Sequence, residues 1–92
     1  MNDFIRRQHD QVLFKIAEYR RGSLDLNHLT NQLEGLAHAI GESFWTEQML
    51  PLIFDLERIN SEIIDKKRNP TTKEESDIEV TLKAIEKIIA KH

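Results

Sequence analysis

The sequence predicts an all-α fold, an antiparallel four-helix bundle that forms a single helical domain over residues 1–92. Apolar residues recur at steps of three and four in four segments, which is the spacing along one side of an α-helix. No segment alternates apolar and polar residues as a half-buried strand does. The segment 25–40 has the clearest stripe, which is too apolar to face water and which other helices must cover: Leu26, Leu29, Leu33, Leu36 and Ile40.

The composition is that of a folded, water-soluble domain. Of the 92 residues, 39% are hydrophobic and 32% are charged, which is too apolar for a disordered chain. There is no cysteine, which excludes disulfides and thiolate metal ligands. No apolar run approaches the roughly 20 residues that span a bilayer, and the N-terminus lacks the apolar core of a signal peptide. We therefore expect a cytoplasmic protein with no membrane partner.

The first helix is expected to begin at Asn2 or Asp3, since either side chain can cap a helix, and to end before Gly22. His9 interrupts its apolar face, and a histidine at such a boundary is far more often a structural residue than a ligand or a base. The residues that share this face are Ile5, His9, Val12, Leu13, Ile16 and Ala17.

Capping signals place the second and fourth helices. Ser23 or Asp25 can cap the second helix, which runs to Gly41. Thr71 and Thr72 each have a glutamate three residues further on, so that either can start the fourth helix with a capping box. The apolar stripe of the fourth helix is widened at two positions and consists of Ile78, Leu82, Ile85 and Ile89, with Val80 and Ile88 beside them.

The third helix is the longest, over about residues 44–67, with Ser43 as its cap. Pro51 lies inside it, where it removes one backbone hydrogen bond and clashes with the preceding turn, so we expect a kink near this residue. Were the kink to split the helix, the part after Pro51 would be about 17 residues or 25 Å long. The predicted inner stripe consists of Trp45, Met49, Leu52, Leu56, Ile59 and Ile63.

Charge is unevenly distributed along the chain. Residues 23–65 contain eight acidic residues and one basic residue, Arg58, whereas residues 1–22 and 66–92 each carry a small excess of Lys and Arg. An acidic helical face of this kind repels nucleic acid and attracts a basic partner. The simpler interpretation, which the sequence leaves open, is a solvated surface that keeps the protein in solution.

No residue pattern indicates catalysis or a cofactor, so we expect a protein that is not an enzyme. None of the four histidines has another histidine three or four residues away, so no helical zinc site is predicted. The three glycines are isolated, unlike those of a phosphate-binding loop. A DNA-binding helix-turn-helix needs a basic recognition helix, whereas the second and third helices are the acidic ones, so no nucleic-acid partner is expected.

Two local patterns involve His38. The run from Ala37 to Gly41 resembles the phosphate-accepting histidine of phosphotransfer domains, but the lysine after the histidine is absent and the glycine comes one position early. His38 and Glu42 also form a His-x-x-x-Glu pair, a spacing that is common by chance. Neither pattern predicts a site.

A longer pattern covers roughly residues 12–64. It comprises Tyr19-Arg20-Arg21-Gly22-Ser23-Leu24-Asp25-Leu26, Leu29, Leu33-Glu34-Gly35-Leu36, Trp45, Met49 and Leu56-Glu57. This pattern resembles small helical immunity proteins, which protect bacteria from their own polymorphic toxins, including those of contact-dependent growth inhibition systems. Gly22, Trp45 and the two Leu-Glu pairs carry most of the resemblance, whereas Ile53 stands where the family has an aromatic residue.

The resemblance implies a non-enzymatic inhibitor that binds one cognate toxin domain, commonly a nuclease, at or beside its active site. A nuclease presents a basic cleft to its polyanionic substrate, and an acidic helical face is complementary to such a cleft. The alternative function is a helical adaptor or dimerisation module with no toxin partner. Homo-oligomerisation is compatible with either function.

The candidate contact residues lie on the outer side of the second and third helices. Leu50 and Phe54 point away from the predicted inner stripe, and an aromatic residue ringed by charges is typical of a binding hot spot. Alternatively, Phe54 packs under the first or fourth helix or at the end of the bundle. The predicted partner-binding residues are Glu34, Glu47, Phe54, Glu57 and Asp65.

Overall fold

Four α-helices make up the regular structure of residues 3–41 and 43–91, which the computed structural model describes, with residues 43–45 described by their backbone alone. The helices are α1 (Asp3–Arg20), α2 (Leu26–Ile40), α3 (Ser43–Lys66) and α4 (Thr72–Ala90). The predicted all-α four-helix architecture is confirmed. None of these helices combines the length and the apolarity that crossing a membrane requires.

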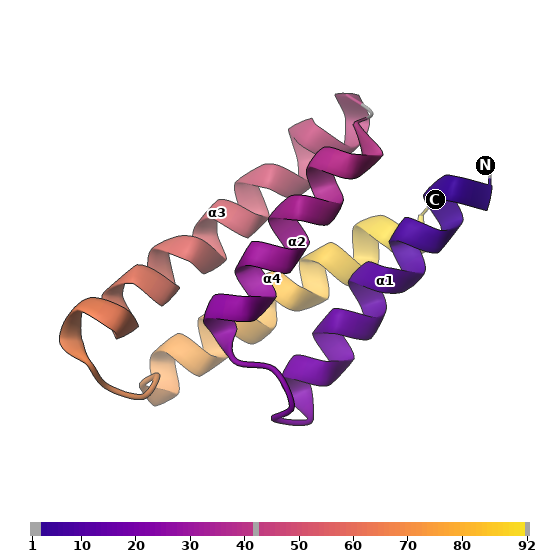
Figure 1. Ribbon diagram of the computed structural model, residues 1–92. Helices are drawn as coiled ribbons and strands as arrows, with labels where there is room; N and C mark the ends of the chain where they lie inside the picture. Colours follow the sequence, from indigo (N-terminus) through magenta and orange to yellow (C-terminus); the bar gives the residue numbers. More distant parts are fainter. Residues whose placement is uncertain (1–2, 42, 92) are drawn as a thin grey trace.

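The helices are arranged in a ring in which consecutive helices are antiparallel neighbours (Figure 1). The α1–α2 and α3–α4 connections lie at one end of the bundle, and the α2–α3 connection and both termini lie at the other (Figure 1). α2 packs on α1 and α3, and α4 packs mainly on α3. Arg20 ties α1 to α4 by ion pairs to Glu79 at 2.5 Å and to Glu86 at 2.8 Å.

The helix boundaries follow the capping signals of the sequence. The Asp25 side chain accepts a hydrogen bond from the His28 backbone N–H at 2.8 Å, which makes Asp25, rather than Ser23, the N-cap of α2. Gly41 ends α2 in the left-handed conformation with φ 67°, and Gly22 adopts φ 80° in the turn after α1. The predictions for Asn2 and Glu42 fall outside the described residues, and those for the Ser43 cap and the Trp45 core position depend on side chains that are not described.

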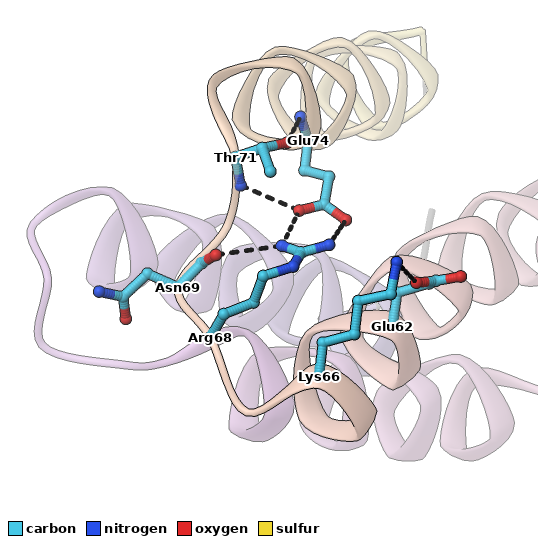
Figure 2. A network of polar contacts seen from close by, with 6 residues as sticks. All are labelled: Glu62, Lys66, Arg68, Asn69, Thr71 and Glu74. Atoms are coloured by element: carbon cyan, nitrogen blue, oxygen red, sulfur yellow. Dashed lines mark hydrogen bonds and ion pairs between the residues drawn. The ribbon is translucent and has the colours of Figure 1, made fainter.

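A polar network starts α4 and closes the preceding loop (Figure 2). Thr71, rather than Thr72, is the N-cap, and its hydroxyl accepts from the Glu74 N–H at 3.1 Å while the Glu74 carboxylate accepts from the Thr71 N–H at 2.9 Å. Arg68 donates to both oxygens of the same carboxylate, at 2.5 and 3.1 Å, and to the Asn69 carbonyl at 3.1 Å. These bonds hold the pKa of Glu74 down at about 2, with the Arg68 hydrogen bond as the largest cause. The loop is therefore fixed to the first turn of α4.

The core forms along the inner sides of all four helices. Leu29 of α2, Leu56 of α3 and Leu82 of α4 have no exposed surface. The α4 stripe is confirmed at all four predicted core positions, and Ala37 rather than Leu36 completes the α2 stripe. The buried apolar cluster consists of Val12, Ile16, Leu26, Leu29, Leu33, Ala37, Ile40, Met49, Ile53, Leu56, Ile78, Leu82, Ile85 and Ile89.

The predicted stripe of α3 was correct at Met49 and Leu56, which are buried, but it is displaced to one side of the line that α3 buries. Ile53 and Asn60 complete the buried line, whereas Leu52 and Ile59 are half-buried. α3 lies between α2 and α4, so its buried line points between these two neighbours, while Leu52, Ile59 and Ile63 pack at the edge of the core. Pro51 is exposed inside α3, and the helix continues through it, so the proline does not split the helix.

Two further predicted core positions were wrong. Leu13 of α1 is 37% exposed and Val80 of α4 is 66% exposed. Val80 is two residues from both Ile78 and Leu82, and a two-residue step on a helix turns the side chain by about 200°, away from the core. Leu13 follows the buried Val12 and is turned from it by about 100°, toward the solvent-facing edge of α1. Both errors came from widening the predicted stripes too far.

The phase of α3 can be tested with two truncations. Ile53→Ala removes a side chain that is 1% exposed, and we expect it to lower the free energy of unfolding by about 2–5 kcal/mol. Leu52→Ala, at a half-buried position, is the matched control and should cost at most about half as much. Urea unfolding followed by circular dichroism measures both. A larger loss for Leu52→Ala would mean that the helix is rotated toward the predicted stripe.

Candidate functional site

The outer side of the α2–α3 pair brings two of the predicted contact residues together. Glu34 of α2 and Glu57 of α3 share a hydrogen bond between their carboxyl groups. Three residues further along α3, the buried Asn60 donates from Nδ2 to Oδ1 of Asn27 of α2 at 3.0 Å. These two cross-helix contacts define the α2/α3 face, which is the surface on which Glu34, Glu57 and Asn27 lie.

Two carboxyl groups that share a hydrogen bond cannot both carry a full negative charge without a cost in free energy. The hydrogen bond to Glu34, partial burial and the charge of Glu34 together raise the pKa of Glu57 to about 7. Near neutral pH the pair therefore holds a proton part of the time. His38 lies one turn after Glu34 on α2, with its Nε2 3.7 Å from Oε1 of Glu34. The arrangement offers carboxylate oxygens to a cation at the surface.

Phe54 lies beside this pair, on the solvent side of α3. It precedes Glu57 by three residues, about one helical turn, and half of its side chain is exposed. The alternative that Phe54 belongs to the core is therefore excluded, because the apolar cluster contains other α3 residues and not this one.

Glu47 and Asp65 extend the same stripe of α3 in both directions. They lie seven residues before and eleven residues after Phe54, or about 10 and 16 Å along the axis, close to whole numbers of turns. Both are exposed, and neither forms an ion pair with the residues that the structure describes. Arg58, which is also exposed, interrupts the stripe with a positive charge. All five predicted residues thus lie on or beside the α2/α3 face, but only Glu34 and Glu57 touch.

Two further carboxylates of the acidic block, those of Asp55 and Glu62, do not belong to this face. Asp55 and Glu62 lie on the α4 side of α3 and line a groove with residues of α4. They form ion pairs within α3, Asp55 with Arg58 at 3.5 Å and Glu62 with Lys66 at 3.1 Å (Figure 2). The acidic residues therefore do not form one face, because α3 carries Asp55 and Glu62 on the side of α4 and its other carboxylates on or beside the α2/α3 face.

The sequence analysis missed the Asn27–Asn60 contact. Asn60 was not considered, because the predicted stripe of α3 passed through Ile59 and Ile63 instead. The spacing in the sequence does not reveal this contact, because Asn27 and Glu34 are seven residues apart on α2, or about 10 Å, whereas Glu57 and Asn60 are three apart on α3, or about 5 Å. The contact follows from the packing of α3 on α2.

The histidines and the carboxylates near them are the side chains to consider as metal ligands. They contain no group of three or more His, Asp or Glu side chains arranged to hold a metal ion. His28 is hydrogen-bonded to Asp25 through Nδ1 at 2.7 Å, and His9 is 4% exposed within α1. The predicted His38–Glu42 pair lies outside the described residues, while His38 neighbours Glu34 instead.

The carboxyl pair gives a pH dependence with a definite sign. Since the pKa of Glu57 is raised from 4.5 to about 7, the folded state binds this proton more tightly than the unfolded chain. The tighter binding of this proton stabilises the folded state below pH 4.5, and this stabilisation is lost as the pH rises to about 7. In Glu34→Gln the amide donates to Glu57, so the Glu57 pKa should fall toward 4.5 and the variant should gain stability relative to wild type at pH 8.

Carbon-13 NMR of the Glu57 carboxyl group measures the midpoint directly, and thermal unfolding at pH 4 and pH 8 measures the stability. Glu47→Gln is the matched control, because Glu47 lies on α3 with no ion pair among the described residues. It should leave the Glu57 midpoint unchanged. A wild-type midpoint near 4.5 would show that the two carboxyl groups do not interact.

Comparisons with known proteins give no further guide to the site. No protein-family model, no curated protein and no solved structure matches this chain. The geometry of the α2/α3 face is therefore the basis for assigning a function.

Proposed function

We propose that this protein is an immunity protein that binds and neutralises a cognate toxin domain, a basic nuclease, through the α2/α3 face. The observation that carries the proposal is Phe54, an aromatic side chain that is half-exposed next to a carboxyl pair on an otherwise charged surface. Aromatic residues with this placement are enriched among the anchors of protein interfaces.

The charges around Phe54 support a basic partner. Glu34, Glu57, Glu47 and Asp65 are on the same side of the molecule, and Glu47 and Asp65 lack ion-pair partners among the described residues. Opposite charges across an interface raise the association rate, and a desolvated aromatic anchor slows dissociation. An inhibitor of a nuclease needs both properties, because it must bind before the toxin reaches nucleic acid.

The proposed inhibition requires no chemistry from this chain. A helical face of this kind occupies a basic cleft with carboxylates where the nuclease would bind phosphates. The side chains named above are sufficient for that role, and the proposal assigns no catalytic residue and no cofactor. The resemblance of residues 12–64 to small helical immunity proteins is the second, independent support.

The alternative function is a helical adaptor or dimerisation module. Exposed apolar residues on α1 favour it, namely Phe4, Leu13 and Phe14. They are spread around the helix, since Leu13 and Phe14 are about 100° apart, so they do not form the continuous stripe of a helical dimer interface. A dimerisation module would gain mass with concentration in size-exclusion chromatography, whereas an immunity protein gains mass only with its partner.

The anchor can be tested by truncation. Phe54→Ala should weaken binding to the cognate toxin domain by at least about 2 kcal/mol, or roughly 30-fold in Kd. Because half of Phe54 is exposed and it lies outside the core cluster, the variant should remain folded. Isothermal titration calorimetry measures the affinity, and circular dichroism measures the fold.

Phe14→Ala is the matched control, because Phe14 is equally exposed but lies on α1, where Lys15 Nζ is 5.6 Å from its ring centroid. It should bind like wild type. Unchanged affinity of Phe54→Ala, or an equal loss for Phe14→Ala, would contradict the proposal.

A further inference from the structure

We propose that the cavity at the loop end of the α2/α3 face is a second part of the partner site, which takes an uncharged apolar side chain of the partner together with the peptide group beside it. This inference rests on the proposed function, because it describes the segment that the toxin domain would present. The cavity itself, however, can be tested without any toxin.

The cavity has a volume of about 320 Å³ and opens where the α1–α2 and α3–α4 connections meet α3. This volume is at the lower limit of ordinary ligand pockets, so it suits one side chain and an adjacent peptide group. Most of its surface is apolar. The apolar lining residues are Leu26, Ile63, Ile64 and Pro70.

The charged groups at the rim of the cavity are already paired. Arg68 donates both bonds of its guanidinium fork to Glu74 (Figure 2). Asp25 accepts bonds from the backbone and the ring of His28 at 2.8 and 2.7 Å, which lower its pKa. Tyr19 stays neutral, since burial and nearby glutamates raise its pKa. A charged ligand would find no free counter-charge here, whereas an uncharged ligand would fit.

The free polar groups of the cavity match a peptide group. Asn60 uses Nδ2, and Asn27 uses Oδ1, in the bond between them. Asn60 therefore keeps its carbonyl oxygen as an acceptor, and Asn27 keeps its NH2 group as a donor. Neither group has a partner among the described residues. A peptide N–H and C=O would satisfy both.

The cavity lies along the same two helices as the carboxyl pair, which argues for a polypeptide rather than a small metabolite. Asn60 lies three residues, or about 5 Å, beyond Glu57 on α3, and Asn27 lies seven residues before Glu34 on α2. An apolar side chain in the cavity thus places the neighbouring part of its segment against two carboxyl groups. The partner segment is expected to carry a Lys or Arg close to the apolar residue.

Capped amino acids serve as probes of the cavity in the isolated protein. N-acetylphenylalaninamide has an aromatic side chain and two neutral amides. N-acetylglycinamide has the amides without the ring. Phenylacetate, which is not an amino acid, has the ring and a negative charge. In ¹H–¹⁵N NMR titrations, the first should give saturable shifts of the Asn27 and Asn60 side-chain amides. The other two should bind at least roughly tenfold more weakly.

Two exposed positions provide a matched pair of variants. Ile64→Glu places a charge on the cavity wall at a residue that is 52% exposed, and should abolish the saturable shifts. Val80→Glu makes a similar change at a residue that is 66% exposed on α4, and should leave them intact. Thermal unfolding checks that both variants fold.

The double variant Glu34→Gln, Glu57→Gln separates the two proposals. It should keep the probe in the cavity and lose affinity for the toxin domain. Three results would overturn the cavity proposal: phenylacetate binds as tightly as N-acetylphenylalaninamide, the shifts do not saturate, or Ile64→Glu leaves the shifts unchanged. A variant that loses toxin binding but still binds the probe bears on the proposed function and leaves the cavity proposal unchanged.

Discussion

The structure depends on covering both flanks of α2. Leu29 and Leu33 in the middle of this helix have almost no exposed surface, which requires a neighbour on each side. α1 and α3 provide these neighbours, and α4 closes the ring against α3. Because α2 packs on both α1 and α3, this packing fixes the position of its outer edge relative to α3.

The contact between α2 and α3 also fixes the register of the outer residues. The buried Asn60 is hydrogen-bonded to Asn27, and a sliding of α3 by one turn would leave a buried amide without a partner. In this register Glu34 and Glu57 meet. The amide pair thus determines where the carboxyl pair lies, although only one of its members is buried.

The carboxyl pair is unfavourable for folding at neutral pH, and this agrees with a role in binding. The contact with Glu34 raises the pKa of Glu57 to about 7, whereas the carboxylates of Glu79, Asp55 and Glu62 are paired with Arg or Lys. A cation from a partner would relieve the repulsion between Glu34 and Glu57. Sites that violate the local rules of stability are frequently the sites that act on other molecules.

The sequence predicted the helices well and the faces of the helices less well. Capping residues such as Asp25 and Thr71 act locally, so their neighbours in the sequence were enough to place them. The phase of α3 depends on how it packs between α2 and α4, which no local pattern reveals, so Ile53 and Asn60 were missed. Phe54 was placed outward correctly, because the two possible phases agree on that side of the helix.

The most direct test of the account asks which aromatic side chain the toxin domain covers. Hydroxyl-radical footprinting with mass spectrometry compares the oxidation of Phe4, Phe14 and Phe54 in the free protein, where all three are exposed, with their oxidation in the complex. We expect Phe54 to be protected in the complex, and Phe4 and Phe14 to be oxidised as in the free protein. Protection of the two α1 residues with continued oxidation of Phe54 would contradict it.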